Sequence, residues 1–377
     1  MKRLFPLLSL LFLVNIAHAA TPWLKRPLRF VCADSVITWG YDGKDFRQFA
    51  LMTDSSATAF PMSLTREAWN ERKQVFEKWN AAASERNVVG GTGNPLTESQ
   101  GFAAAKWLSQ AADLFQMQGH AAYVDYMERA LYNAILHSAH DTLLPRGSMD
   151  RKAAASLLMA APGWIYATSG KADLFVNLYT NCTSTIPLGD GTISVDQITN
   201  MPMTGGVKLR LTRLGQGRQF ALHLRMPDWA GLRPSTHFAY VGGEPQQPTI
   251  YVNGHELDPL EVDDKGYVVI DRLWRNLDEV YVDFPVQAHY IKPLLTPTAN
   301  RLAPIYGQAA LQWGPLVYVV NASASDYFAP SQPALPINDV SESGYPILQG
   351  KLFHTQGVPQ DAEATGETFV VKPYGDL

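Results

Sequence analysis

The sequence has 377 residues, of which 46% are hydrophobic and 18% are charged, and its formal net charge is −4. A chain of this length can bury a substantial core, and it usually forms two domains or one large domain with an appendage. The charged fraction lies below the roughly 25% that is typical of soluble domains. Because the balance of charge is mildly acidic, we expect no nucleic-acid partner.

The N-terminus has the pattern of a secretory signal. Lys2 and Arg3 precede an apolar run that extends from Leu4 to Ile16, and Ala17-His18-Ala19 follows as a cleavage pattern. The apolar run is too short to span a bilayer comfortably, which favours a cleaved signal peptide over residues 1–19. We therefore expect a secreted or periplasmic protein that is not bound to the membrane.

The sequence has two cysteines, Cys32 and Cys182. In an oxidising compartment they could form one disulfide, and they could equally be two small buried apolar residues. Neither has a neighbouring Cys or His at metal-ligand spacing. We therefore expect no structural zinc site and no cofactor.

Residues from about Ser63 to Ala167 have helical periodicity, and we expect paired antiparallel helices there. Four segments carry the pattern: 63–83, 101–119, 121–139 and 150–170. The second should end at Gly119 and the fourth near Pro162, where a helix bends or stops. The inward residues expected in the second helix are Phe102, Ala105, Leu108, Ala112 and Phe115, and those in the third are Val124, Met127, Leu131, Ala134 and Ile135. In the third helix Asp125 and Arg129 have the spacing of an i,i+4 ion pair.

From Asp173 onward the pattern changes to short alternating runs broken by Gly, Pro and Asn at intervals of about 10 residues, which is typical of an antiparallel β-sandwich region. The sequence "YVNGHEL" contains Asn-Gly between apolar runs, the strongest short hairpin signal. The proline-rich residues 329–350 are expected to be an irregular connection before a last strand at "ETFVVKPY". We expect a domain boundary between residues 170 and 171.

The glycine-rich stretch "VVGGTGNPLTESQGF" does not fit a phosphate-binding loop. It lacks the Gly-Lys-Ser/Thr end of a P-loop, and no strong strand precedes it. Thr97 or Asn94 can cap the following helix, with Glu98 in its first turn. Glu98 then either complements the helix dipole or faces a ligand, and the local pattern leaves both open.

The run from Val88 to Ser138 resembles the bacterial β-L-arabinofuranosidase family, glycoside hydrolase family 127. The resemblance rests on the Gly-Gly-x-Gly loop, on Glu98 in the next helix, and on the motif Tyr-x-Asp-x-x-Glu-x-x-Leu-Tyr-Asn. It continues through "GWIYATSGKADLFVNLY", "LRMPDWA", "GYVVIDRLW" and "AALQWGPLVYVV", to about residue 320. In this sequence the motif residues are Tyr123, Asp125, Glu128, Leu131, Tyr132 and Asn133.

The resemblance implies an α+β multidomain fold. A partial (α/α) helical-barrel domain over residues 20–170 would precede an antiparallel β-sandwich region over residues 171–377. It also implies an oligo- or polysaccharide substrate from which terminal L-arabinofuranose is released.

The sequence departs from the family at the residues that carry its chemistry. The family's Glu-Thr-Cys reads Glu98-Ser99-Gln100 here, and the stretch before "GWIYA" contains no cysteine, so the implied zinc-bound thiolate is missing. A retaining glycosidase needs a nucleophile and an acid/base about 5 Å apart. Only Glu98 matches a family catalytic position, and a second carboxylate would have to be one such as Glu128 or Asp141. Glu128 itself is better explained as a structural residue held by Arg129 and Tyr132.

A carboxylate that serves a substrate should converge with aromatic groups, and we expect Trp107 and Tyr132 to contact the sugar beside Glu98. His137, His140 and Asp141 could share one helix face, although a solvent-exposed helix end rich in histidine is the simpler interpretation. Two functional hypotheses follow. The chain is either a shortened glycoside hydrolase with an altered active site or a non-catalytic glycan-binding or structural homologue, and a fragment of a longer ancestor is a third interpretation.

Overall fold

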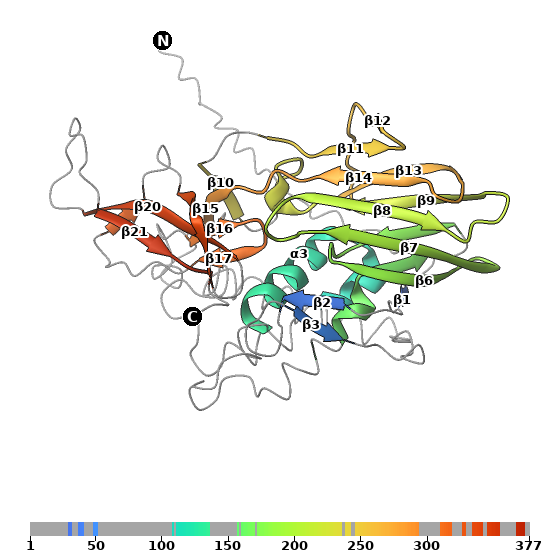
Figure 1. Ribbon diagram of the computed structural model, residues 1–377, viewed down its shortest axis with the longest axis horizontal. Helices are drawn as coiled ribbons and strands as arrows, with labels where there is room; N and C mark the ends of the chain where they lie inside the picture. Colours follow the sequence, from blue (N-terminus) through green and yellow to red (C-terminus); the bar gives the residue numbers. More distant parts are fainter. Residues whose placement is uncertain are drawn as a thin grey trace, which may run out of the picture.

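The computed structural model describes residues 29–31, 37–40, 48–51, 108, 111–135, 157, 160–169, 172–235, 238–242, 246–293, 310–318, 326–328, 334–341, 345–354 and 367–373. Strands predominate within these ranges, and a short helical part lies against one of the sheets (Figure 1). The predicted signal peptide, the helix over residues 63–83, Glu98, Trp107, Cys32, and the group His137, His140 and Asp141 lie outside the described residues.

The predicted second and third helices are present where the structure describes them. Residues 111–118 are helical and end at Gly119, whose φ of 72° is the left-handed conformation of a helix C-terminus. Helix α3 spans Ala121–Arg129 and continues as the π-helix η1, Ala130–Ile135. The predicted inward residues that the structure describes are fully or almost fully buried: Leu108, Ala112, Phe115, Val124, Met127, Leu131 and Ile135.

The predicted end of the fourth helix near Pro162 is confirmed, but the expected extension of the helical region to Ala167 is wrong. The 3-10 helix η2 spans Ala161–Trp164, and strand β4 begins directly afterwards at Tyr166–Ser169. Pro162 cannot donate a backbone hydrogen bond, so helix is not favoured through this point. Tyr166 and Ala167 are fully buried, and β4 pairs with two other strands, which stabilises an extended backbone in place of a helix.

The first sheet combines strands from distant parts of the chain. Its order is β1-β4-β5-β9-β13, and β5 and β9 are parallel whereas the other neighbours are antiparallel. Two of its strands, β1 and β4, precede position 171, so this sheet contains residues from both sides of the predicted boundary. The predicted domain boundary itself stays a prediction. Besides β4, the strands of this sheet are β1 Arg29–Val31, β5 Asp173–Val176, β9 Arg218–Arg225 and β13 Tyr267–Trp274.

The second sheet is antiparallel and contains six described strands in the order β12-β11-β14-β8-β7-β6. Asn253 and Gly254, with φ of 53° and 80°, form the predicted tight turn between β11 and β12. Buried and partly exposed residues alternate along β8, so one face of this sheet points inward and the other outward. Its strands are β6 Cys182–Leu188, β7 Gly191–Thr199, β8 Gly206–Thr212, β11 Thr249–Val252, β12 His255–Glu256 and β14 Glu279–Asp283.

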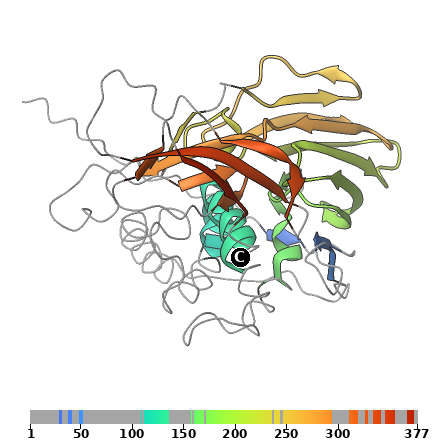
Figure 2. The ribbon, with the colours of Figure 1, turned by 60° about the vertical axis from the view of Figure 1, so that its left-hand side comes forward.

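The two sheets lie face to face, and helix α3 lies on the other side of the first sheet (Figure 2). The Tyr166 hydroxyl from the first sheet lies 3.5 Å from the Cys182 sulfur in the second. Trp274 is fully buried, stacks on Phe220 and donates a hydrogen bond from its indole nitrogen to the Phe220 carbonyl. Burial of such aromatic residues contributes much of the stability of a core.

The remaining strands form a four-stranded sheet in the order β10-β15-β16-β17, a C-terminal sheet of β18, β19, β20 and β21, and the hairpin β2-β3. The 3-10 helix η3, Asp228–Ala230, follows β9. The bounds are β2 Ile37–Gly40, β3 Gln48–Leu51, β10 Phe238–Val241, β15 Ala288–Pro293, β16 Ala310–Trp313, β17 Leu316–Tyr318, β18 Asp326–Phe328, β19 Leu335–Val340, β20 Pro346–His354 and β21 Glu367–Val371.

The proline-rich stretch at residues 329–350 is not an irregular connection, as its composition had suggested. It contains β19 and the start of β20. Pro336 lies in β19, which pairs only with β20 among the described strands and whose register shifts beyond Pro336. Proline is tolerated in this position because an edge strand leaves backbone donors unpaired in any case. The predicted last strand at "ETFVVKPY" is confirmed as β21.

Candidate functional site

A buried cluster of charged side chains connects helix α3, which carries the Tyr-x-Asp-x-x-Glu motif, to the sheets. Asp125 and Glu128 are three residues apart on α3, so both side chains lie on one helix face. Arg225, at the end of β9, is fully buried and donates to both of them, with 2.7 Å between its Nη1 and Asp125 Oδ1. Its Nε donates to the Asn177 carbonyl. One guanidinium therefore holds together the helix, β9 and the residue that follows β5.

The second oxygen of each carboxylate is also bound. Arg233 donates to Asp125 Oδ2, and the indole nitrogen of Trp229 lies 3.0 Å from Glu128 Oε2. Both acids are almost completely buried. A general acid or base must reach a substrate with a free oxygen. The contacts of Glu128 confirm that it is structural, although the group that holds it is Arg225 and not, as expected, Arg129.

Arg129 pairs with Asp228 in η3, at 2.9 and 3.1 Å from the two carboxylate oxygens. Ser235 and Tyr240 also donate to Asp228, at 2.7 and 3.0 Å. The predicted i,i+4 pairing of Arg129 with Asp125 is thus replaced by pairings with residues of the β region. The cluster contains three acidic and three basic side chains, so its formal charges cancel.

The pKa values in this cluster follow from burial and from the arginines. Burial raises the pKa of Asp125, and its arginine partners oppose that shift. Burial also acts to raise the pKa of Asp228, but Arg129 and Arg233 outweigh it and lower that pKa to about 2. Asp228 is therefore ionised throughout the ordinary pH range and stabilises the folded state as a carboxylate.

The low pKa of Asp228 gives a testable dependence of stability on pH. Because the folded-state pKa lies below that of the unfolded chain, the stabilisation is complete above about pH 4 and is lost as pH falls towards 2. We expect Asp228→Asn to lower the free energy of unfolding by about 2–3 kcal/mol at pH 6, and by progressively less below pH 4. Urea unfolding at pH 6, 4 and 2.5 measures the difference from wild type.

The control for this experiment is Asp271→Asn, which alters an exposed carboxylate that accepts a hydrogen bond from Gln219. We expect its difference from wild type to stay small at each pH. A gap between wild type and Asp228→Asn that is as large at pH 2.5 as at pH 6 contradicts the assignment.

Asn133, the last motif residue, connects the π-helix to the four-stranded sheet. Its amide nitrogen donates to the Arg129 carbonyl at 2.8 Å and to the Pro315 carbonyl at 2.9 Å, and its oxygen accepts from the Val317 backbone nitrogen at 2.8 Å. Two of these three hydrogen bonds, those to Pro315 and Val317, hold the turn between β16 and β17 against the helix. Asn133 and the two acids thus act together as an anchor between the helix and the sheets.

Tyr132 lies in the core, with 7% of its surface exposed. Burial raises its pKa well above the ordinary tyrosine value. The structure gives Tyr132 a packing role in η1, and its contact with a sugar stays a prediction, as do the predicted roles of Glu98 and Trp107.

Cys182 is a free, buried thiol, which excludes the disulfide with Cys32 in this structure. Burial raises its pKa to about 11, although Tyr166, Ser184 and Gln197 lie around the sulfur and oppose that shift. A zinc-bound thiolate needs a low pKa and further ligands, and within the described residues no three His, Cys, Asp or Glu side chains gather to hold a metal ion. The described residues therefore do not fit the zinc thiolate of the resembling family.

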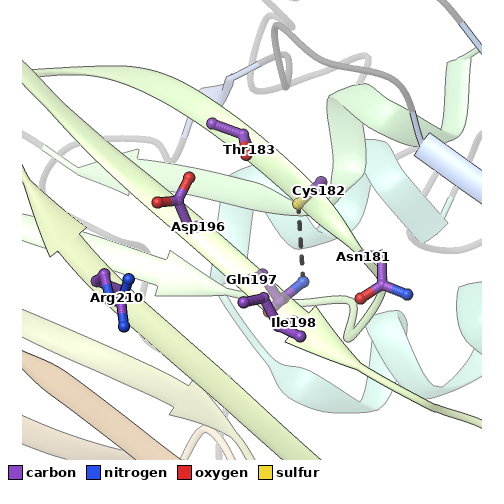
Figure 3. Close-up of a pocket in the computed structure, with 7 residues that line it drawn as sticks. All are labelled: Asn181, Cys182, Thr183, Asp196, Gln197, Ile198 and Arg210. Carbon is purple, nitrogen blue, oxygen red and sulfur yellow. Dashed lines mark hydrogen bonds between the residues drawn. The ribbon is translucent and has the colours of Figure 1, made fainter.

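A shallow hollow of about 560 Å³ lies over one end of the second sheet (Figure 3). No sequence motif pointed to this hollow. Cross-strand alternation could have found its polar residues, but only with the strand register known. Its lining residues are Asn181, Cys182, Thr183, Asp196, Gln197, Ile198 and Arg210.

None of the helices that the structure describes has the length and apolar character needed to cross a membrane.

Residues 173–286 match the family model described as the middle domain of beta-L-arabinofuranosidase, GH127. The resemblance to this family is therefore confirmed, over a shorter stretch than the sequence motifs had suggested. The match starts after the motif helix and covers most of the two layered sheets. No curated protein matches the chain.

Solved structures are similar in fold. The GH127 beta-arabinofuranosidase BT3674 has a TM-score of 0.60 at 20% identity, over 73% of this chain and 46% of that one. A protein described as a glycoside hydrolase has a TM-score of 0.56 at 19% identity, over 73% and 49%. A GH127 beta-L-arabinofuranosidase from Geobacillus stearothermophilus T6 has 0.54 at 22%, over 73% and 47%. The chain thus spans about half the length of each of these structures.

Proposed function

We propose that the chain is a secreted carbohydrate-active protein of the glycoside hydrolase type with an altered active site. A partial (α/α) helical barrel would lie beside a β-sandwich region. The observation that carries the proposal is the match of residues 173–286 to the GH127 middle domain, with a similar fold across 73% of the chain. Since two of the similar structures are named as arabinofuranosidases, we take terminal L-arabinofuranose of plant glycans as the substrate.

The charge cluster restricts which residues could perform the hydrolysis. Arg225 and Trp229 bind the two oxygens of Glu128, so Glu128 has no free oxygen with which to act as the second catalytic carboxylate. Glu98 is the remaining acid that matches a family position, and its partner would have to be another carboxylate such as Asp141. Two acids about 6.5–9.5 Å apart can catalyse inverting hydrolysis, which needs neither a thiolate nor zinc.

The experiment is hydrolysis of a panel of aryl glycosides, including 4-nitrophenyl β-L-arabinofuranoside, by wild type and by Glu98→Gln. The glutamine keeps the shape of the side chain and removes its charge. We expect the rate per folded molecule to fall by about 10²–10⁴-fold with little change in melting temperature. The matched control is Glu256→Gln on the exposed strand β12, which should keep wild-type activity. A Glu98→Gln variant that loses stability but keeps its activity per folded molecule would reduce Glu98 to a helix cap.

A second candidate is a non-catalytic glycan-binding homologue. It is favoured by the use of Asp125 and Glu128 as structural anchors and by the missing family cysteines. This candidate predicts that wild type hydrolyses none of the glycosides but still binds arabinose-containing polysaccharides. Binding without hydrolysis, equal in wild type and Glu98→Gln, would decide for it.

A further inference from the structure

We propose that the outer face of the second sheet is a binding site for a neutral oligosaccharide strand, separate from any catalytic centre. Strand register places two rows of side chains across this face. One row is Thr183, Asp196, Arg210 and Glu279, and the other is Ile198, Lys208, Tyr281 and Tyr251. We call these two rows the tyrosine face.

The two tyrosines provide a surface on which a sugar ring can stack. Tyr281 is 41% exposed, and its ring centroid lies 6.4 Å from that of Tyr251. The hydroxyl end of Tyr281 lies over Gly206, where a Cβ atom would approach it to 2.9 Å. The missing side chain of Gly206 leaves room for that end of the Tyr281 ring. An exposed aromatic ring can present its negative face to the C–H groups of a sugar.

Beside the tyrosines, charged groups are held in place by one another. Glu279 Oε1 accepts from Arg210 at 2.8 and 2.7 Å, and its Oε2 lies 2.8 Å from Lys208 Nζ. Each of these three side chains remains about a third or more exposed. Asp196 is the cross-strand neighbour of Arg210, so two acids face two bases. Fixed donors and acceptors suit sugar hydroxyls, and the balance of charge favours a neutral glycan over an acidic one.

The hollow extends this surface along the strand order. Thr183, Asp196 and Arg210 line it from β6, β7 and β8, and Ile198 lies at its border with the second row (Figure 3). From β7 to β11 there are three strand spacings, or roughly 14 Å. A ligand in contact with both the hollow and the tyrosines must therefore be an extended chain of several sugars.

The tyrosine face does not depend on the proposed hydrolysis. Helix α3 contacts the first sheet through Arg225, whereas the tyrosine face lies on the outside of the second sheet. Its role would be to hold a polysaccharide near the protein, whether or not the proposed helical-barrel domain hydrolyses that polysaccharide.

The test is affinity electrophoresis of the purified protein through gels that contain debranched arabinan, arabinoxylan or polygalacturonate. We expect a neutral polysaccharide to retard the wild type, and Tyr281→Ala to weaken that retardation about five- to tenfold. Gly206→Ala should weaken it similarly, because the added methyl group displaces the ring while both tyrosines remain. Tyr281→Phe, which keeps the ring, should bind like wild type.

Leu277→Ala is the control, since Leu277 is 66% exposed and lies in the turn before β14, outside both rows. Far-UV circular dichroism of every variant separates loss of binding from loss of fold. The measured quantity is retardation and not hydrolysis, so failure of the hydrolysis proposal leaves this result intact. The proposal is overturned if no neutral polysaccharide retards the protein, if only polygalacturonate does so, or if folded Tyr281→Ala and Gly206→Ala bind like wild type.

Discussion

Replacement of Arg225 with alanine is expected to lower the free energy of unfolding by about 3–5 kcal/mol, because it leaves two buried carboxylates without their shared partner. Arg225 has no exposed surface and bridges Asp125, Glu128 and the Asn177 carbonyl. In water the carboxylates would be hydrated, but in this cluster only the arginines and Trp229 are described as their donors. Urea unfolding of wild type and variant at neutral pH measures the loss.

Two further variants sharpen this prediction. Arg272→Ala removes an arginine whose side chain is 41% exposed and lies 4.0 Å from Asp278, and it should cost no more than about 1 kcal/mol. Adding Glu128→Gln to Arg225→Ala should recover part of the lost stability, because one unpaired buried charge is then removed. An Arg225→Ala variant as stable as Arg272→Ala would mean that the cluster does not anchor the helix to the sheets.

Gly205→Ala is expected to destabilise the protein by about 3 kcal/mol or more. A Cβ atom at Gly205 would lie 1.7 Å from the Phe284 carbonyl oxygen, which belongs to the backbone and cannot rotate away. The Gly205 carbonyl also accepts a hydrogen bond from the Phe284 nitrogen at 3.1 Å. The substitution must therefore force apart the chain segments at the ends of β8 and β14, in the middle of the second sheet.

The adjacent Gly206→Ala provides a matched control for stability. Its Cβ would meet the hydroxyl end of Tyr281, a side chain that can move. We expect Gly206→Ala to stay within about 1 kcal/mol of wild type in thermal and urea unfolding, although it should weaken glycan binding. Equal stabilities of the two alanine variants would contradict the close backbone approach at Gly205.

Several elements were predictable because their signals are local. The apolar spacing of Val124, Met127 and Leu131 identified a helix and its buried face, and Asn253-Gly254 identified a hairpin. Predictions failed where long-range pairing outweighed local preference. Tyr166–Ser169 became a strand between β1 and β5, and the proline-rich region formed an edge strand. The strands that pair with these two segments cannot be identified from the sequence of the segments themselves.

The amino-acid sequence by itself determined the helical and strand periodicities, the turns, and the motif through which the resemblance to a glycosidase family could be found. Only the tertiary structure decided what the motif does. From the sequence, Asp125 was expected to pair with Arg129 and Glu128 was one possible second catalytic acid, whereas in the fold both pair with Arg225, about a hundred positions later in the chain. Helix and turn preferences depend on neighbouring residues, whereas the role of a carboxylate depends on the groups that surround it after folding. The tyrosine face likewise exists only once strand register brings Tyr251 beside Tyr281.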